Sequence, residues 1–215
     1  MIKIGVIAGS TRPGRRALDV ANWVLDVAGM RGDAVFELVD IQAYNLPLLD
    51  EPVPPSMGQY TQPHTKVWSA KIAGFDGFVF VTPEYNHGTS GALKNAIDFL
   101  FKEWNDKAAG FVSYGSIGGA RAVESLRLVM GELMVADVRA QVMLTLRDDW
   151  QEHAFKPREH HEQALDTLLD QVVAWSRALK TLRHDAEQPA LADAPQLAPE
   201  LAAEAPPPGR RVGSM

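Results

Sequence analysis

Residues 77–81 read GFVFV, a short run that is apolar throughout and is stopped by Pro83. A strand that is apolar on both faces fits a parallel sheet covered by helices on both sides, because neither face then meets water. Four further runs are short, β-branched or aromatic and bounded by Gly, Pro or polar residues, and they lie at about 2–8, 35–40, 108–114 and 138–146. We therefore predict five strands.

Amphipathic stretches alternate with these runs and predict helices at about 15–30, 65–75, 90–101, 119–135 and 158–183. Right-handed crossovers through such helices make a doubly wound α/β domain with helices on both faces of the sheet. Five strand–helix units suit the flavodoxin-like order 2-1-3-4-5. Ligands of such sheets bind beyond the carboxyl ends of the strands, where the order reverses between strands 1 and 3. The loops after these strands are therefore the first place to look for a site.

Composition and charge narrow the possible functions. The chain has 215 residues, 46% hydrophobic and 22% charged, which is enough for a sizeable core. Its net charge of -6 gives no general attraction to nucleic acid and favours a small-molecule partner. It has no cysteine, so redox chemistry would need a bound organic cofactor. The lack of a signal-peptide pattern and of a long apolar run predicts a cytoplasmic protein without membrane insertion.

The end of the chain differs from the rest. From about Glu187 onward it is rich in Ala, Pro and acidic residues and has no aromatic side chain. We predict a folded domain over 1–185 and a disordered Ala/Pro-rich tail over 186–215. Inside the domain, 46–60 is an unusually long loop with four prolines, and such loops are usually functional or mobile.

The loop after the first strand, 9–16, reads GSTRPGRR. A helix start with free N–H groups, two hydroxyls and several guanidiniums is an anion site, most naturally for a phosphate monoester. The loop lacks the GxxxxGK[ST] motif of nucleoside triphosphatases and the GxGxxG motif of dinucleotide folds, which indicates a single phosphate. We expect Arg12 and either Arg15 or Arg16 to bind it. The alternative is an arginine-rich helix start that makes surface ion pairs.

The loop after the third strand, 82–98, reads TPEYNHGTSGALKNAID. Gly88 and Gly91 let the backbone approach a ligand closely, and Thr89 or Ser90 can cap the helix that follows. Backbone N–H groups of such a turn suit the oxygens and N5 of a flavin ring, against which a tyrosine offers an aromatic wall. A second glycine-rich turn, SYGSIGG at 113–119, follows the fourth strand at the same edge of the sheet.

Three motifs together make the sequence similar to a known family. They are GSxR after the first strand, PEYN with GALKNAID after the third, and SYG after the fourth. In this order, over about residues 2–180, they resemble the NAD(P)H-dependent FMN reductases, which include quinone, azo and chromate reductases. The resemblance implies a flavodoxin-like fold, non-covalent FMN, a homodimer or homotetramer, and ping-pong transfer of two electrons. NADPH or NADH would give hydride to flavin N5, and a small acceptor (a quinone, an azo compound, a metal oxyanion or free flavin) would receive it.

The resemblance also implies roles for residues of the three loops, with the flavin rather than a side chain carrying the chemistry. The implied cofactor-binding residues are Ser10, Thr11, Arg12 and Arg15 at the phosphate, Pro83, Glu84, Tyr85 and Asn86 along the isoalloxazine, and Ser113, Tyr114 and Gly115 on its other side. His87 is either a substrate or nicotinamide contact or a simple helix-start residue. Ser116 is a second candidate for a substrate contact.

Other conspicuous residues have plainer interpretations. The acidic and basic neighbours of His153, His160 and His161 make these histidines look solvated, so we predict no metal site. Trp104 and Asn105 either border the site of a partner subunit or pack in the core.

The sequence also leaves two interpretations for the polar face of the helix at 90–101. Lys94, Asn95 and Asp98 lie on that face and meet either solvent or a dimer partner.

Two other function classes remain as alternatives: a flavodoxin-type electron carrier without NAD(P)H activity of its own, and a flavin-bound redox sensor that signals through protein contact.

Overall fold

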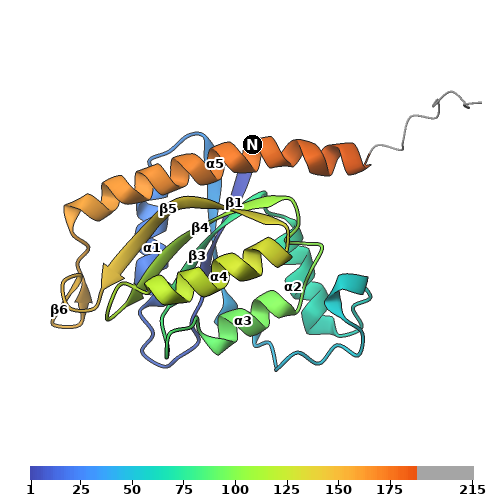
Figure 1. Cartoon of the computed structure of the whole chain (residues 1–215), viewed down its shortest axis with the longest axis horizontal. Coiled ribbons are helices and arrows are strands. Elements are labelled where there is room, and N and C mark those ends of the chain that lie inside the picture. Colours follow the sequence, from blue (N-terminus) through green and yellow to red (C-terminus); the bar gives the residue numbers. More distant parts are fainter. Residues whose placement is uncertain (188–215) are drawn as a thin grey trace, which may run out of the picture.

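The core of the computed structural model, which describes residues 1–187, is a parallel sheet in the order β2-β1-β3-β4-β5 (Figure 1). This confirms the predicted flavodoxin-like order. The strands of this sheet are β1 (Ile2–Ala8), β2 (Ala34–Asp40), β3 (Gly77–Pro83), β4 (Lys107–Gly115) and β5 (Val135–Thr145). All seven residues of β3 are buried, as a central strand with helices on both sides requires.

Helices cover both faces of the sheet. They are α1 (Ala17–Ala28), α2 (Pro63–Ala73), α3 (Gly91–Asp98), α4 (Ala120–Glu132) and α5 (Glu159–Glu187). In Figure 1, α5 runs along one side of the sheet, and α3 and α4 lie on the other. Val79 and Val81 of β3 belong to the core cluster formed with α1 and α5. Phe78 and Phe80 belong to the cluster formed with α2, α3 and α4, so successive β3 side chains serve opposite layers.

Trp104 and Asn105, for which the sequence left two interpretations, both make hydrogen bonds within the folded domain. Trp104 is fully buried, and its indole N–H donates to the carbonyl of Ile97 at 3.1 Å. The amide of Asn105 donates to the carbonyls of Phe101 and Leu133 at 3.1 and 2.8 Å. Within the described part of the chain, both residues therefore have a structural role in the core.

The long loop before α2 is fastened at both ends. The Asn95 side chain of α3 accepts from the Leu49 N–H at 3.0 Å and donates to the Pro47 carbonyl at 2.7 Å. Glu51 accepts from the Thr61 N–H and hydroxyl, each at 2.8 Å. Burial alone would raise the pKa of Glu51, but hydrogen bonds to its carboxylate lower that pKa to about 2. The loop also contains the 3₁₀ turn η2 (Pro55–Met57), and another, η1 (Ile41–Tyr44), follows β2.

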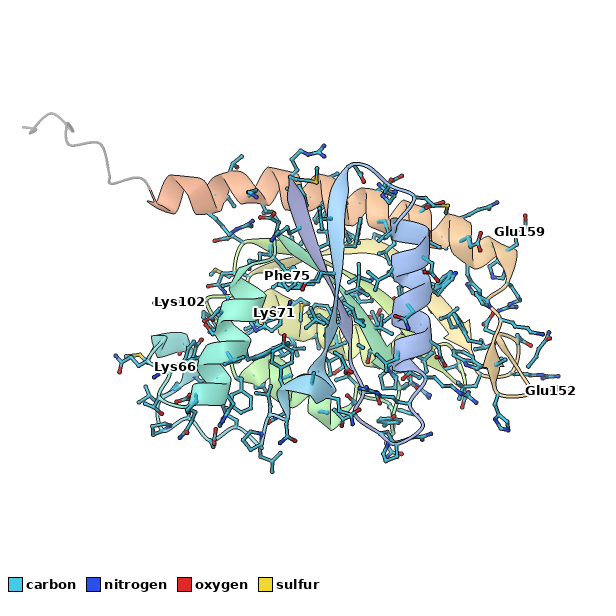
Figure 2. All side chains as sticks on the ribbon, turned by 180° about the vertical axis from the view of Figure 1, so that it is seen from behind. Lys66, Lys71, Phe75, Lys102, Glu152 and Glu159 are labelled. Carbon is cyan, nitrogen blue, oxygen red and sulfur yellow. The ribbon has the colours of Figure 1, made fainter. Side chains whose placement is uncertain are left out.

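Some boundaries differ from the sequence analysis. A hairpin of β6 (Trp150–Gln151) and β7 (Ala154–Phe155) lies between β5 and α5. Its turn residues Glu152 and His153 have left-handed φ values of 47° and 70°, without the Asn-Gly or Asp-Gly signal that usually reveals such a turn. Figure 2 shows Glu152 at the same end of the molecule as Glu159, where α5 begins.

The predicted tail lies almost entirely outside the described residues. Helix α5 continues to Glu187, so the first two residues of the expected tail belong to the helix instead. Residues 188–215 are not among those described. Within residues 1–187, no helix has the length and apolar character needed to cross a membrane.

A close contact between β4 and α5 gives a test of the fold. A Cβ at Gly110 would lie 2.8 Å from side-chain carbons of Leu168 and Val172, whereas a Cβ at Gly131 of α4 would meet open space. We expect Gly110→Ala to lower the free energy of unfolding by about 1 to 3 kcal/mol through overpacking. The matched Gly131→Ala should raise it by roughly 0.5 to 1 kcal/mol, because alanine is the better helix former. Urea unfolding measures both changes, and equal effects of the two variants would contradict this packing.

Candidate functional site

Loops that follow β1, β3, β4 and β5 meet in one pocket at the carboxyl edge of the sheet. Its volume is about 200 Å³. It is lined by Arg12, Arg15, Arg16, Pro83, Glu84, Tyr85, Tyr114, Gly115 and Leu146. A larger hollow of about 470 Å³ lies between α3 and α4, but its lining includes none of these loops. We take the smaller pocket as the candidate site because it lies where the strand order reverses.

Arg15 is held by a carboxylate. Its Nη1 and Nη2 donate to the two oxygens of Asp40, at the end of β2, at 2.6 and 2.7 Å. Its Nη1 also donates to the carbonyl of Ser10 at 2.7 Å. This bidentate pair ties the β1 loop to β2 and neutralises the charge of Arg15.

Arg12 and Arg16 differ from Arg15 in their surroundings. Neither forms an ion pair with any other residue of the described chain. Arg12 is exposed, and Arg16 is half-buried with its guanidinium carbon 4.9 Å from the centre of the Trp150 ring. Two positive charges at the pocket are therefore available to an anion. Of the two candidates left open by the sequence, Arg16 has the uncompensated charge.

Tyr114 lines this end of the pocket, and the buried Ser10 contacts the lining residue Tyr85. Ser10 is fully buried, and its Oγ lies 3.3 Å from the Tyr85 hydroxyl. The Tyr114 hydroxyl is buried without a hydrogen-bond partner among residues 1–187. Burial, helped by the neighbouring Tyr85, raises the pKa of Tyr114 above its usual range and outweighs the opposing effect of the nearby Ser10 hydroxyl, so the Tyr114 hydroxyl stays protonated. A buried donor without a partner beside two unpaired guanidiniums fits a phosphate group.

A rigid turn forms the opposite wall. Tyr85 and Gly88 exchange two backbone hydrogen bonds of 2.9 and 3.0 Å. Between them, Asn86 and His87 have left-handed φ values of 49° and 69°. The unusual backbone therefore lies in Asn86 and His87 rather than in the two glycines that the sequence analysis singled out. Asparagine tolerates this region better than most residues, whereas glycine was the stronger signal in the sequence.

Ser90 links this turn to the β1 loop. Its hydroxyl accepts from the Leu93 N–H at 3.0 Å, which caps α3, and donates to the Gly9 carbonyl at 2.6 Å. Of the two predicted candidates, Ser90 is therefore the cap. Thr89 instead contacts the hydroxyl of Thr82 at 2.7 Å.

The side chain of Glu84 already has partners in the protein. Its carboxylate is 4% exposed and pairs with the Arg121 guanidinium of α4. It also accepts from the Arg121 N–H at 3.0 Å. Burial would raise the pKa of Glu84, but hydrogen bonds and the charge of Arg121 lower it. Arg121 in turn lies 2.6 Å from Nε2 of His87, so Glu84 and Arg121 join α4 to the turn.

The remaining predicted residues are placed in different ways. Ser113 is fully buried, and its hydroxyl donates to the Gly118 carbonyl at 2.6 Å, which shapes the turn after β4. Thr11 lines a neighbouring hollow near η1 and α3. The predicted residues that do not line the pocket are Ser10, Thr11, Asn86, His87, Ser113 and Ser116. Sequence reasoning missed Arg121 and Leu146, because neither belongs to a recognisable motif.

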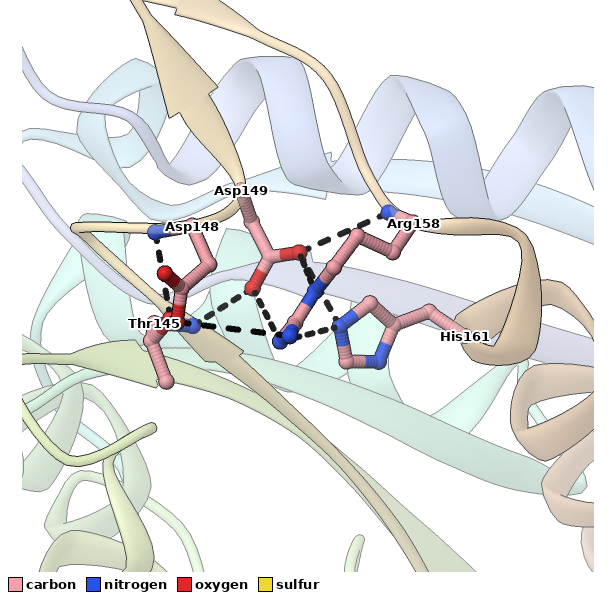
Figure 3. A network of polar contacts seen from close by, with 5 residues as sticks. All are labelled: Thr145, Asp148, Asp149, Arg158 and His161. Carbon is pink, nitrogen blue, oxygen red and sulfur yellow. Dashed lines mark hydrogen bonds and ion pairs between the residues drawn. The ribbon is translucent and has the colours of Figure 1, made fainter.

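A buried polar network joins the end of β5 to the start of α5 (Figure 3). The carboxylate of Asp149 is fully buried and accepts from the Thr145 N–H at 2.7 Å and from Nε of Arg158 at 3.0 Å. It also lies 3.0 Å from Nε2 of His161. The interpretation of His161 as solvated is therefore wrong: it is 5% exposed. No group of three or more His, Cys, Asp or Glu side chains within residues 1–187 is arranged to hold a metal ion.

The network predicts a pH dependence of stability. Burial is the main cause that lowers the pKa of His161 below 6.5, opposed by the charge of Asp149. Below about pH 6.5, His161 is therefore protonated more readily in the unfolded chain than in the folded protein. The free energy of unfolding consequently falls as the pH is lowered. We expect the free energy of unfolding to fall between pH 7.5 and 5.5 more steeply in the wild type than in His161→Gln. The difference in slope should be at most about 1.4 kcal/mol per pH unit, the limit for one proton.

The control for this measurement is His153→Asn at the exposed hairpin turn, which should keep the wild-type slope. Equal slopes for the wild type and His161→Gln would show that His161 does not resist protonation.

Comparison with known proteins identifies the family of the chain. Residues 2–149 match the family model described as NADPH-dependent FMN reductase. The chain is 47% identical over 140 residues to an NAD(P)H-dependent FMN reductase of Nectria sp, covering 60% of this chain and 70% of that protein. It is 45% identical over 149 residues to one of Schizosaccharomyces pombe, covering 68% and 74%.

Two further similarities extend over more of the chain. A 2-hydroxy-1,4-benzoquinone reductase of Burkholderia sp is 29% identical over 185 residues, which cover 82% of this chain and 97% of that protein. The solved structure of FerB, a flavoenzyme NAD(P)H:(acceptor) oxidoreductase from Paracoccus denitrificans, shares the fold with a TM-score of 0.66 at 20% identity. That match covers 83% of this chain and 98% of the other. With the family model spanning most of the folded part, the chain belongs to the NADPH-dependent FMN reductase family, whose members are oxidoreductases.

Proposed function

We propose that the protein holds FMN in the pocket at the carboxyl edge of the sheet and reduces a small acceptor, a quinone first of all, at the expense of NADPH or NADH. The observation that carries this proposal is the unpaired positive charge of Arg12 and Arg16 beside the unpartnered Tyr114 hydroxyl. When bound, FMN supplies an N5 atom that takes up hydride and passes two electrons on. The protein's own residues bind, orient and enclose the cofactor.

At the phosphate end, Arg12 and Arg16 supply charge and Tyr114 supplies a hydroxyl, while the buried hydroxyl of Ser10 supports this end through its contact with Tyr85. Arg15 keeps the loop in place through Asp40 rather than supplying the main charge. Each hydrogen bond to a charged group contributes roughly 1.5 to 3 kcal/mol, more than the helix dipole. The side chains therefore dominate retention of the phosphate in this proposal.

At the ring end, Pro83, Tyr85 and Gly115 line the pocket and bound a flat group. The backbone N–H groups of Asn86 and His87 make no hydrogen bond to any described residue, which leaves them for the polar edge of the ring. Ser113 shapes the turn after β4, and Glu84, which also lines the pocket, joins the turn after β3 to α4. His87 and Ser116 are exposed beside the pocket, where an acceptor or a nicotinamide would approach.

Quinones are the acceptor class that the relatives favour. The Burkholderia protein is named a 2-hydroxy-1,4-benzoquinone reductase, and a protein of Escherichia coli, 31% identical over 137 residues, is named a quinone reductase. Azo compounds, metal oxyanions and free flavin are the other acceptors to compare. The proposed reaction needs no nucleophilic side chain, in line with a chain that has no cysteine.

We further propose that the protein forms a homodimer or homotetramer. The hollow between α3 and α4 is lined partly by apolar residues, among them Leu128, which is 80% exposed. Exposed apolar surface of this kind often marks a contact between proteins. Sedimentation of the purified protein would measure the oligomeric state directly.

The reductase activity has a direct test. We expect the purified protein with FMN to oxidise NADPH or NADH continuously when a benzoquinone is present. Because donor and acceptor would use one site in turn, double-reciprocal plots at several quinone concentrations should be parallel. Stopped-flow absorbance and steady-state assays measure both properties. A protein that binds FMN but consumes almost no NAD(P)H without a separate reductase would be an electron carrier, which would overturn the proposal.

The phosphate anchors have a separate test that does not depend on turnover. We expect Arg12→Ala combined with Arg16→Ala to weaken FMN binding at least about 100-fold, since two charged contacts of about 1.5 kcal/mol each are lost. Riboflavin, which has no phosphate, should bind the wild type and this variant equally. Calorimetric titration of flavin-free protein with both ligands measures this, with Arg177→Ala on exposed α5 surface as the control. Retention of full FMN affinity by the double variant would exclude these anchors.

A further inference from the structure

The residue after Asp149 forms a support behind the phosphate end of the pocket. Trp150 begins the β6–β7 hairpin and is 6% exposed. The guanidinium carbon of Arg16 lies 4.9 Å from the centre of its ring. The same ring packs against Tyr114 at 5.9 Å and against Phe155 of β7 at 4.8 Å, measured between ring centres. Trp150 therefore contacts two residues that line the pocket without lining it itself.

The position of Trp150 is fixed from both ends of the hairpin. Before it, the buried carboxylate of Asp149 is held by Arg158 and His161 at the start of α5 (Figure 3). After it, the Lys156 N–H donates to the carbonyl of Asp149 at 2.9 Å. The hairpin is thus closed across its base, and the indole has little freedom to move away from Arg16. The match to the family model ends at Asp149, so this support lies just beyond it.

Arg15 and Arg16, the last two residues of the loop after β1, are held in chemically different ways. Arg15 is held by a carboxylate, which orders the side chain and also neutralises its charge. Arg16 is held over an aromatic face, which restricts the side chain through a cation–π contact and leaves its N–H donors and its charge free for another partner. Ordering a long side chain before a ligand arrives removes part of the entropy cost of binding. An aromatic support is therefore suited to an arginine that binds an anion.

We propose that Trp150 is a positioning residue for phosphate binding: it holds the Arg16 guanidinium at the phosphate end of the FMN pocket, and Asp149 with Arg158 and His161 keeps Trp150 in place. The proposal rests on the proposed FMN site. It adds the segment after β5 to the parts of the chain that determine cofactor affinity. It also makes selection for FMN over riboflavin depend on a residue that does not touch the cofactor.

A double-mutant cycle tests this role by flavin binding. Calorimetric titration of flavin-free full-length protein with FMN should show about 5- to 30-fold weaker binding for Trp150→Leu, the range expected when a partly buried cation–π contact is lost. Riboflavin affinity should stay within about twofold of the wild type. In the Arg16→Ala background, Trp150→Leu should cause no further loss, because the residue acts through Arg16. Trp175→Leu, at a half-exposed position of α5, serves as the matched control and should change neither affinity.

A conservative variant keeps the test informative if Trp150→Leu does not fold. Trp150→Phe retains an aromatic face and should weaken FMN binding only about threefold, again with no effect once Arg16 is alanine. Equal losses for FMN and riboflavin, or a loss that persists in Arg16→Ala, would overturn the positioning role. If the wild type binds neither flavin, the FMN site itself is refuted. Wild-type FMN binding that neither tryptophan variant changes would refute only the role of Trp150.

Discussion

The burial of β3 on both faces is the constraint on which the rest of this structure depends. Valines of the strand pack toward α1 and α5, and phenylalanines pack toward α2, α3 and α4. A strand with no polar face is stable only between two helical layers, and that arrangement places β1 and β4 on its two sides. Since the five strands of the main sheet are parallel, the loops that follow them reach one edge. The burial of β3 at the centre of a parallel sheet therefore also places the loops that form the pocket.

Hydrogen bonds and an ion pair then connect the neighbouring loops that form the wall of the pocket. Ser90 joins the loop after β3 to the loop after β1, and Glu84 with Arg121 joins it to α4. The Glu84 N–H also donates to the Tyr114 carbonyl at 3.1 Å, which fixes β3 and β4 at their ends. These buried groups are hydrogen-bonded within the protein, whereas Tyr114 keeps an unpartnered hydroxyl in the pocket. The contrast separates groups that hold the site together from groups left for a ligand.

Local electrostatics matters more here than net charge. The protein as a whole is acidic, yet the loop after β1 concentrates three arginines at one end of the pocket. Asp40 neutralises one of them, and the other two have no acidic partner in the described chain. A site of this kind recognises a small anion without giving the whole surface a charge that would attract nucleic acid. The same arrangement explains why Arg15, which is paired with Asp40, lies next to Arg16, which has no acidic partner in the described chain.

The sequence by itself determined the five strands of the main sheet, their order, the three loops and the family, because hydrophobic periodicity and short motifs can be recognised along the chain. It also indicated a single-phosphate loop from the residues between Ser10 and Arg16. It did not determine which arginine is neutralised, because Asp40 lies 25 positions from Arg15 and meets it only when β1 and β2 pair. In the same way, His161 is buried only when the segment after β5 meets the start of α5, and the support that Trp150 gives to Arg16 arises only when that segment reaches the start of α1. Contacts between distant segments depend on side-chain direction and packing, and only the tertiary structure decides those.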